Sequence, residues 1–190
     1  MKNNTDRCRW VNSDNPLYVA YHDNEWGVPL HDDSKLFELL ILETFQAGLS
    51  WECVLNKREA FRIAFDGFDA QTISNYGDEK ISLLVKDTSI IRHRLKIKAA
   101  VQNSRAFIAL QKEYGSFDKF IWSFTNGKTI CEPYSKRTTS KLSDKISLTL
   151  KKRGFSFVGS TTIYSLLQAC GIINGHGCEC FKFINKTKLR

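Results

Sequence analysis

The sequence predicts an all-α protein, and three observations support this. Apolar residues recur with helical spacing along most of the chain, and a capping residue or a glycine stands at the ends of most such stretches. No segment alternates apolar and polar residues convincingly with the period of a strand. The chain has 190 residues, of which 42% are hydrophobic and 25% charged. This length and composition predict one globular domain, residues 1–190, that can bury a core without disulfides.

The first predicted helices follow from the distribution of apolar residues and caps. Segment 1–33 lacks helical periodicity and is expected to be irregular, as is 125–142. Residues 34–46 are apolar nearly all round, so this helix is expected at the centre of the fold. The sequence AGLS ends it, and Ser50 is placed to begin a second helix that extends to about Phe65.

The later helices are separated by glycines and turn residues. Gly77 divides two short helices that begin at aspartates, and Gly115 ends the longest periodic stretch. The remaining predicted helices are 69–76, 78–87, 92–114, 116–124, 143–153 and 159–171.

The charge of the chain is distributed unevenly. Residues 1–90 contain 9 Lys or Arg and 15 Asp or Glu, whereas residues 91–190 contain 19 and 5. A polyanion such as nucleic acid is the natural partner for the second half, and the alternative is a basic surface without a partner. No apolar run approaches the ~18 residues of a membrane span, and the N-terminus has no apolar signal-peptide core. We therefore expect a soluble cytoplasmic protein with no membrane contact, whose cysteines are thiols or metal ligands.

One segment near the C-terminus has the layout of a helix-hairpin-helix. A basic helix ends at Gly154, a short apolar link follows, and a new helix begins at Gly159. A helix N-terminus with free backbone amides binds phosphate, and such a motif at about 148–170 holds a DNA strand without reading its sequence. The basic side chains beside the link are Lys151, Lys152 and Arg153. The alternative is an ordinary corner between two helices.

A second basic run, 90–98, is predicted to lie on a helix. Arg94 and Lys98 share a face of that helix, and Leu95 is expected to point to the core together with its apolar neighbours.

Cysteine and histidine at both ends of the chain indicate a metal site. Two Cys and two His complete a closed tetrahedral zinc site, and the second pair has His-x3-Cys spacing. The candidate ligands are Cys8, His22, His176 and Cys180. Such a site would join segments at about 7–22 and 174–182, which have little helical structure of their own. Cys178 is a rival ligand, and free thiols with a surface histidine are the alternative to any metal.

Glu43 is the third candidate feature, because it lies in the most apolar predicted helix. A buried carboxylate is unfavourable unless it is paired or binds a ligand. Trp51 follows just past the AGLS break, and further aromatic residues crowd the N-terminal segment: Trp10, Tyr18, Tyr21 and Trp26. Together they would form a pocket for a flat, cationic base that carries amino protons. The alternative is a carboxylate satisfied inside the core, with aromatic residues that simply pack.

The order of these features along the chain resembles one family closely. The similar strings are RCRWV (7–11), PLYVAYHDNEWGVPLHDDSKLFELL (16–40), LETFQAGLSWECVL (42–55), IIRHRLKIKAAVQNSRAFI (90–108), WSFTNGK (122–128) and KKRGFSFVGSTTIYSLLQACGIIN (151–174). They resemble the 3-methyladenine DNA glycosylase I family of bacterial alkylation repair, and the likeness covers about residues 7–184. YHDNEWG and QAGLSW are highly specific to that family.

The resemblance implies a helix-hairpin-helix glycosylase fold with a structural zinc ion. The zinc ligands of the family fall on Cys8, His22, His176 and Cys180, which favours Cys180 over Cys178. The hairpin of the family falls on about 154–160.

The resemblance also assigns the pocket. The pocket glutamate of the family falls on Glu43 and its stacking tryptophan on Trp51. Tyr21 matches the tyrosine before the zinc histidine, and further aromatic positions near the base fall on Trp10 and Tyr18. The sequence departs from the family at Thr44, where a small residue is usual.

The resemblance implies hydrolytic release of 3-methyladenine from alkylated double-stranded DNA, with 3-methylguanine as the next candidate. The enzyme is expected to be a monomer without a dinucleotide cofactor and to leave an abasic site. Lys151 and Lys152 are interpreted as phosphate contacts rather than Schiff-base nucleophiles. Two other hypotheses remain: a zinc-stapled DNA-binding module without catalysis, and a basic protein that binds no nucleic acid.

Overall fold

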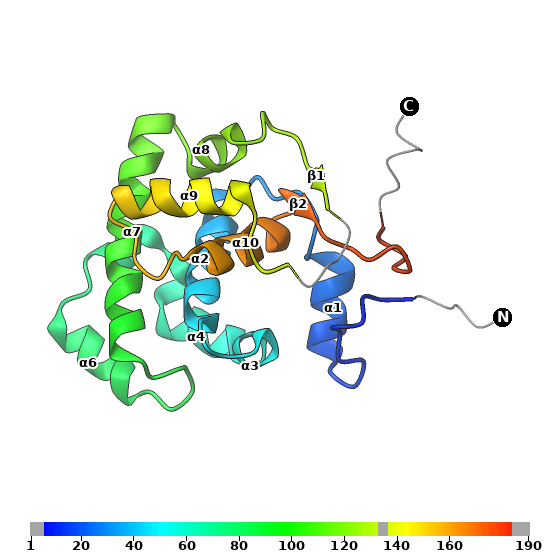
Figure 1. Cartoon of the computed structure of the whole chain (residues 1–190). Coiled ribbons are helices and arrows are strands. Elements are labelled where there is room, and N and C mark those ends of the chain that lie inside the picture. The colour runs from blue at the N-terminus through cyan, green and yellow to red at the C-terminus, as the bar shows by residue number, and fades with distance from the viewer. Residues whose placement is uncertain (1–5, 133–136, 184–190) are drawn as a thin grey trace.

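A computed structural model of the chain describes residues 6–132 and 137–183, which are predominantly helical (Figure 1). The helices are α1 (Pro16–Asn24), α2 (Asp33–Gln46), α3 (Trp51–Leu55), α4 (Arg58–Ala64), the 3-10 helix η1 (Asp66–Phe68), α5 (Ala70–Ser74), α6 (Asp78–Lys86), α7 (Arg94–Tyr114), α8 (Phe117–Ser123), α9 (Lys141–Lys152) and α10 (Ser160–Ala169). Two short strands, β1 (Ile130–Cys131) and β2 (Ile173–Asn174), pair in parallel. None of the helices in the described part of the chain combines the length and apolar composition that a membrane span needs.

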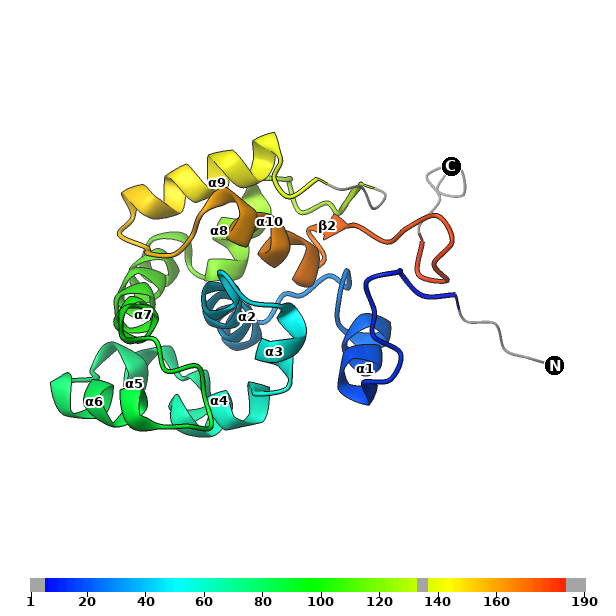
Figure 2. The same ribbon diagram turned by 60° about the horizontal axis from the view of Figure 1, so that its bottom comes forward.

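Helix α2 lies at the centre, as its apolar sequence predicts (Figure 2). Every residue from Leu36 to Phe45 is buried, and the Asp32 side chain caps the helix by accepting from the Lys35 amide at 3.0 Å. Helices α3, α7, α8 and α10 all pack against it. Because α2 contacts so many elements, a side chain on it can reach a site that several segments build together.

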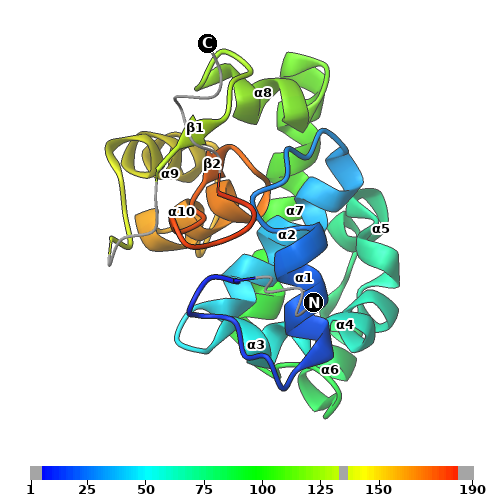
Figure 3. The same ribbon diagram turned by 90° about the vertical axis from the view of Figure 1, so that its right-hand side faces the viewer.

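Two groups of helices flank α2. On one side, α4, η1 and α5 enclose an aromatic cluster in which the rings of Phe45, Phe61 and Phe65 pack with centroids 4.7–5.8 Å apart. On the other side, α9 packs against α10. Helix α1 and the N-terminal segment lie beside the segment that follows β2 (Figure 3), where the Phe181 amide donates to the Asp6 carbonyl at 2.9 Å.

The structure corrects the prediction of an irregular N-terminal segment. Residues 16–24 form α1, which begins with a proline and is capped by Asn15, whose side chain accepts from the Leu17 and Tyr18 amides. The helix has no regular apolar face, since Tyr21 and the adjacent His22 are both buried. Tertiary packing therefore stabilises α1, and periodicity could not reveal it.

Other boundaries also differ from the predictions. The helix expected from Ser50 to Phe65 is divided into α3 and α4 at Asn56 and Lys57. Helix α9 begins two residues earlier than expected, because Ser140 forms a capping box with Ser143. The strand pair is a small exception to the all-α prediction.

The side chains that the basic run 90–98 buries are only in part the ones predicted from the sequence. Leu95, expected in the core, is 62% exposed, whereas Lys96 is 5% exposed. The Lys96 ammonium donates to the Phe45 and Ala47 carbonyls at the C-terminal end of α2, so the polar group is satisfied in place of the leucine. Arg94 and Lys98 are both exposed, as predicted.

Candidate functional site

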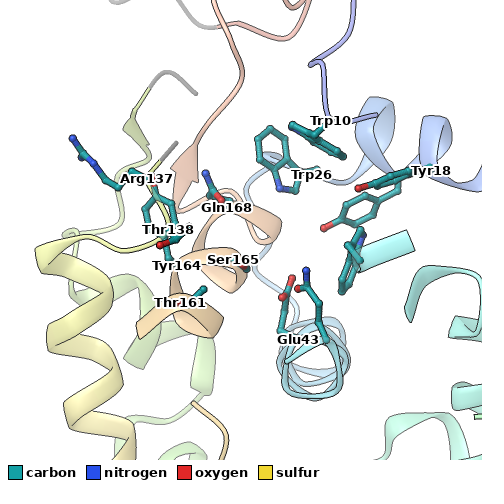
Figure 4. Close-up of a pocket in the computed structure, with 13 residues that line it drawn as sticks. Trp10, Tyr18, Trp26, Glu43, Arg137, Thr138, Thr161, Tyr164, Ser165 and Gln168 are labelled. Carbon is teal, nitrogen blue, oxygen red and sulfur yellow. The ribbon is translucent and has the colours of Figure 1, made fainter. Parts of the chain in front are cut away.

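A cavity of about 330 Å³ opens between α1, the α2–α3 junction and α10. Figure 4 shows Glu43 rising from α2 into this space, with side chains of α10 on one side and Tyr18 on the other. All six side chains predicted to form a base pocket line this cavity: Glu43, Tyr21, Trp51, Tyr18, Trp10 and Trp26. Helix packing thus brings the N-terminal aromatic residues to a carboxyl group more than twenty residues away in the sequence.

Glu43 is buried without a partner for its carboxyl group. The residue is 3% exposed, and its Oε2 atom accepts no hydrogen bond in the described part of the chain. Removal from water raises the pKa of Glu43 to about 8. The Trp51 Nε1 atom is also buried and unpartnered. An unpartnered acceptor and an unpartnered donor on two residues that line one cavity are groups that a polar ligand could satisfy.

Aromatic rings form one wall of the cavity. The Tyr21 and Trp51 rings lie 5.1 Å apart at 43°. Trp10 packs on Tyr18 at 5.3 Å and on Trp26 at 4.8 Å. Tyr21 is 2% exposed, and burial together with the nearby Glu43 carboxyl raises its pKa. These faces suit a flat, electron-poor ring.

The opposite wall was not predicted from the sequence. Helix α10 contributes Thr161, Tyr164, Ser165 and Gln168. These residues reach the cavity only because α10 packs on α2, so no local pattern marks them. Gln46, three residues after Glu43 on the same helix face, also lines the cavity, and its spacing could have revealed it.

Thr44, the departure from the family pattern, does not line the cavity. It is fully buried, and its hydroxyl donates to the Ile41 carbonyl at 2.7 Å. Its extra atoms are therefore accommodated within α2 and its packing.

The four predicted zinc ligands meet at one point. The ligand atoms of Cys8, His22, His176 and Cys180 all lie within 4.8 Å of one another, and all four residues are buried. Cys180 Sγ lies 3.4 Å from His22 Nε2 and 3.4 Å from His176 Nδ1, and Cys8 Sγ lies 3.5 Å from His176 Nδ1. A tetrahedral zinc ion separates its sulfur and nitrogen ligands by about 3.6 Å, so this donor set fits zinc. Cys178 is exposed and outside the group.

The second nitrogen of each histidine is also bonded. His22 Nδ1 lies 2.8 Å from Asp23 Oδ1, and His176 Nε2 lies 3.2 Å from the Trp26 carbonyl oxygen. Such partners fix the ring orientation and tautomer of metal-binding histidines. Gly27 allows this close approach, because a Cβ atom there would lie 2.8 Å from His176 Nε2. The cluster and its surroundings could therefore hold a metal ion.

The predicted hairpin connects α9 to α10. Gly154 has a φ of +87°, which favours glycine, and Gly159 is the N-cap of α10. Lys151 and Lys152 are exposed beside it. Arg153 is also exposed but forms an ion pair with Glu113, so it is less available to a phosphate than its two neighbours.

Comparison with known proteins agrees with this geometry. A family model described as methyladenine glycosylase matches residues 10–183. The chain is 49% identical over 182 residues to DNA-3-methyladenine glycosylase 1 of Escherichia coli K12, covering 93% of this chain and 97% of that protein.

Solved structures are similar over almost the whole chain. A crystal structure of 3-methyladenine DNA glycosylase I superimposes with a TM-score of 0.90 at 46% identity, covering 94% of this chain and 100% of the other. A substituted 3-methyladenine DNA glycosylase I in complex with 3-methyladenine gives a TM-score of 0.89 at 34% identity, covering 94% and 98%. The cavity, the Cys and His cluster and these similarities lead to one conclusion: the chain belongs to the methyladenine glycosylase family.

Proposed function

We propose that this chain is a DNA-3-methyladenine glycosylase, a hydrolase that cleaves the N-glycosidic bond between 3-methyladenine and deoxyribose in alkylated DNA. Family membership supports the reaction, and a related enzyme binds 3-methyladenine. The observation that carries the proposal is Glu43, a buried carboxyl group with an unpartnered oxygen in an aromatic-walled cavity.

The chemistry of the lesion explains why so few groups suffice. Methylation at the third ring position leaves adenine formally cationic and weakens its bond to the sugar, so the base departs without protonation. The enzyme has to extrude the nucleotide, hold the base and admit water to the sugar carbon. Extrusion costs roughly a few kcal/mol, and less for a poorly paired base.

Glu43 selects the lesion by charge and hydrogen bonding. Its carboxylate accepts hydrogen bonds from the edge of the base, including the amino group. Because burial raises the pKa of Glu43 to about 8, the empty cavity favours the protonated form at neutral pH. A cationic base beside the carboxyl group lowers that pKa and stabilises the carboxylate, whereas neutral adenine does not. Glu43 thereby favours 3-methyladenine over the normal base.

The aromatic residues hold the base in place. Tyr21 and Trp51 stack on or flank it, and Tyr18 and Trp10 form the outer wall of the cavity. The Trp51 N–H has no partner among the described residues, and we propose that it donates to an acceptor on the bound lesion. The fit depends on ring faces of fixed spacing.

The α9–α10 connection holds the DNA strand. Backbone amides at the N-terminus of α10, next to Gly154 and Gly159, bind phosphate oxygens, and Lys151 and Lys152 add positive charge. Thr161, in the first turn of α10, lines the cavity, so the strand held at this helix-hairpin-helix lies next to the pocket. Arg153, which pairs with Glu113, adds to the positive electrostatic potential near the hairpin without a direct phosphate contact.

A structural zinc ion held by Cys8, His22, His176 and Cys180 would join the two ends of the chain. It supplies cross-linking and no chemistry of the reaction. The enzyme acts as a monomer on double-stranded DNA, and we place it in the cytoplasm, where that DNA lies.

The cavity predicts a narrow range of substrates. Among the described residues, Glu43 is the only carboxylate and there is no lysine in the lining. With no second carboxylate to activate water or stabilise the sugar cation, 3-methyladenine and 3-methylguanine are the expected products, and 7-methylguanine is not. With no lysine, reduction by borohydride should trap no covalent complex with DNA.

The decisive experiment measures free bases released from methylated duplex DNA by the wild type and by Glu43→Gln. We expect release of 3-methyladenine by the wild type and a decrease of about 100-fold or more in the variant. Glu59→Gln, a change at an exposed carboxylate of α4, is the matched control and should behave as wild type. Excision by Glu43→Gln at the wild-type rate would refute the role of Glu43. DNA binding without any release would favour the non-catalytic module.

A further inference from the structure

Phe157 has a backbone conformation that is rare for its residue type. Its φ is +57°, a region that bulky L-residues rarely adopt. Phe68 is the other phenylalanine with positive φ among the described residues, at +58°. Phe68 is 2% exposed and stacks on Phe65 at 6.0 Å, so burial offsets its strain. Phe157 is 37% exposed, so burial offsets far less of its strain.

The backbone on both sides of Phe157 is held by side chains of neighbouring helices. Asn103 of α7 is fully buried, donates to the Ser156 carbonyl at 3.0 Å and accepts from the Ser156 amide at 2.8 Å. Ser147 of α9 donates to the Val158 carbonyl at 2.6 Å. These hydrogen bonds fix the turn, and the fixed turn imposes the strained conformation on Phe157. The exposed part of its ring is therefore held in a defined position.

The place of the ring connects it to the proposed DNA contact. Phe157 lies in the turn between Gly154 and Gly159, and α10 begins at the next residue, Ser160. Its ring packs edge-on against His93, which caps α7, with centroids 6.3 Å apart. A DNA strand whose phosphates bind the α10 amides would bring its sugars against an apolar group at this position.

We propose that Phe157 is a DNA-contact residue whose ring packs against a deoxyribose of the strand held by the hairpin. This inference rests on the proposed glycosylase function. The contact is apolar, so it adds affinity that does not depend on counterion release. This contact gives a reason for the strained phenylalanine: glycine at this position would relieve the strain, but it has no ring to contact the sugar.

The test is Phe157→Gly, which removes both the ring and the strain. We expect a melting temperature close to that of the wild type, because relief of the strain offsets the loss of a partly buried ring. Affinity for a duplex that carries a stable abasic-site analogue should fall about tenfold, equivalent to about 1.4 kcal/mol. The slope of log affinity against log salt should stay unchanged, and so should affinity for free 3-methyladenine. Lys151→Ala is the contrasting variant, because loss of one phosphate contact should reduce the salt slope by about 1.

Phe157→Tyr, which keeps an aromatic ring in the same backbone, should bind the duplex as the wild type does. Wild-type affinity in Phe157→Gly would overturn the inference, as would a fall in melting temperature or a loss of free-base binding that accompanies the weaker DNA binding. A wild-type protein that neither binds DNA nor releases a base would remove the proposed function itself, which is a distinguishable failure.

Discussion

At Glu43 a single side chain combines an unfavourable burial with the carboxyl group that the proposed function needs. The sequence reveals the first half of this: a carboxylate in LLILETFQ must be paired or must bind something. That its Oε2 has no partner depends on how three segments pack around it, which only the structure gives. The same is true of the Trp51 N–H.

The raised pKa of Glu43 predicts a pH-dependent stability. The folded protein binds the proton up to about pH 8, whereas the unfolded chain releases it near the ordinary pKa of 4.5. The free energy of unfolding therefore decreases as pH rises between these values and levels off above them. Glu43→Gln lacks this titration. As pH rises through this range, its free energy of unfolding relative to that of the wild type should therefore increase by a few kcal/mol, at about 1.4 kcal/mol per pKa unit. Urea unfolding of both proteins from pH 5 to 9 measures this. Parallel profiles would show that Glu43 titrates normally in the fold.

Trp51 and Trp122 form a matched pair for a second prediction. Trp122 donates its Nε1–H to the Leu30 carbonyl at 3.0 Å, whereas that of Trp51 is unpartnered. Trp122→Phe should therefore lower stability by about 1 kcal/mol and leave base binding unchanged. Trp51→Phe should leave stability nearly unchanged and weaken binding of 3-methyladenine several-fold. Thermal unfolding and calorimetric titration would separate the two effects, and equal behaviour of the two variants would contradict the assignment.

At the scale of elements, the sequence predicted most helices of the fold, because periodicity and caps are local properties. Helix α2 and its central position follow from composition alone. Helix α1 was missed because its buried Tyr21 and His22 are adjacent, which no helical pattern signals. In the run 90–98, Leu95 was expected to point to the core, yet it is Lys96 that turns inward. The inward orientation of Lys96 depends on carbonyl groups at the end of α2, which the sequence around Lys96 does not reveal.

Lys96 joins the first turn of α7 to the end of the helix that carries Glu43. Its Nζ atom lies 2.9 Å from the Phe45 carbonyl oxygen and 2.5 Å from that of Ala47. These carbonyls have no helical partners, and they stand at the negative end of the α2 dipole. The ammonium group therefore fixes the turn between Glu43 and Trp51. Burial lowers the pKa of Lys96, but the two carbonyls favour the charged form.

Lys96→Met tests this link. We expect a loss of about 1–3 kcal/mol in the free energy of unfolding, because two buried carbonyls lose their donor. We also expect weaker binding of 3-methyladenine, since the turn that sets the distance between Glu43 and Trp51 is no longer held. Lys98→Met, an exposed change in the same turn of α7, should alter neither quantity. Unfolding in urea and base titration provide the readouts, and unchanged base affinity in Lys96→Met would limit this lysine to stability.

At the scale of the molecule, the cluster of two Cys and two His and the cavity share a wall. The His176 ring packs edge-on against Trp26 at 4.6 Å, and Trp10 packs against His22 at 5.3 Å. Trp10 and Trp26 also line the cavity. The sequence indicated the four ligands by spacing and by family resemblance, but contacts between residues 168 positions apart, such as Cys8 and His176, lie beyond any local pattern.

Removal of the metal is therefore expected to weaken base binding as well as stability. Purified protein should contain close to one equivalent of zinc, and less than about half an equivalent without chelator would count against the site. Cys180→Ser should lower both the zinc content and the melting temperature, and it should reduce affinity for free 3-methyladenine. Cys178→Ser, at the exposed neighbouring cysteine, should change none of these. Unaltered affinity for 3-methyladenine in zinc-free protein would show that Trp10 and Trp26 keep their positions in the cavity wall without the metal.

The joined ends of the chain also have a consequence for synthesis. Trp10, Tyr18 and Tyr21 are made early, yet the cluster that holds their segment needs His176 and Cys180, which are made much later. During synthesis, the aromatic residues of the pocket wall are therefore present long before they can be held in their final positions. The pocket is therefore expected to form only after residues 176–180 have been made, and a ribosome-bound intermediate that still lacks them should neither retain zinc nor recognise a damaged base.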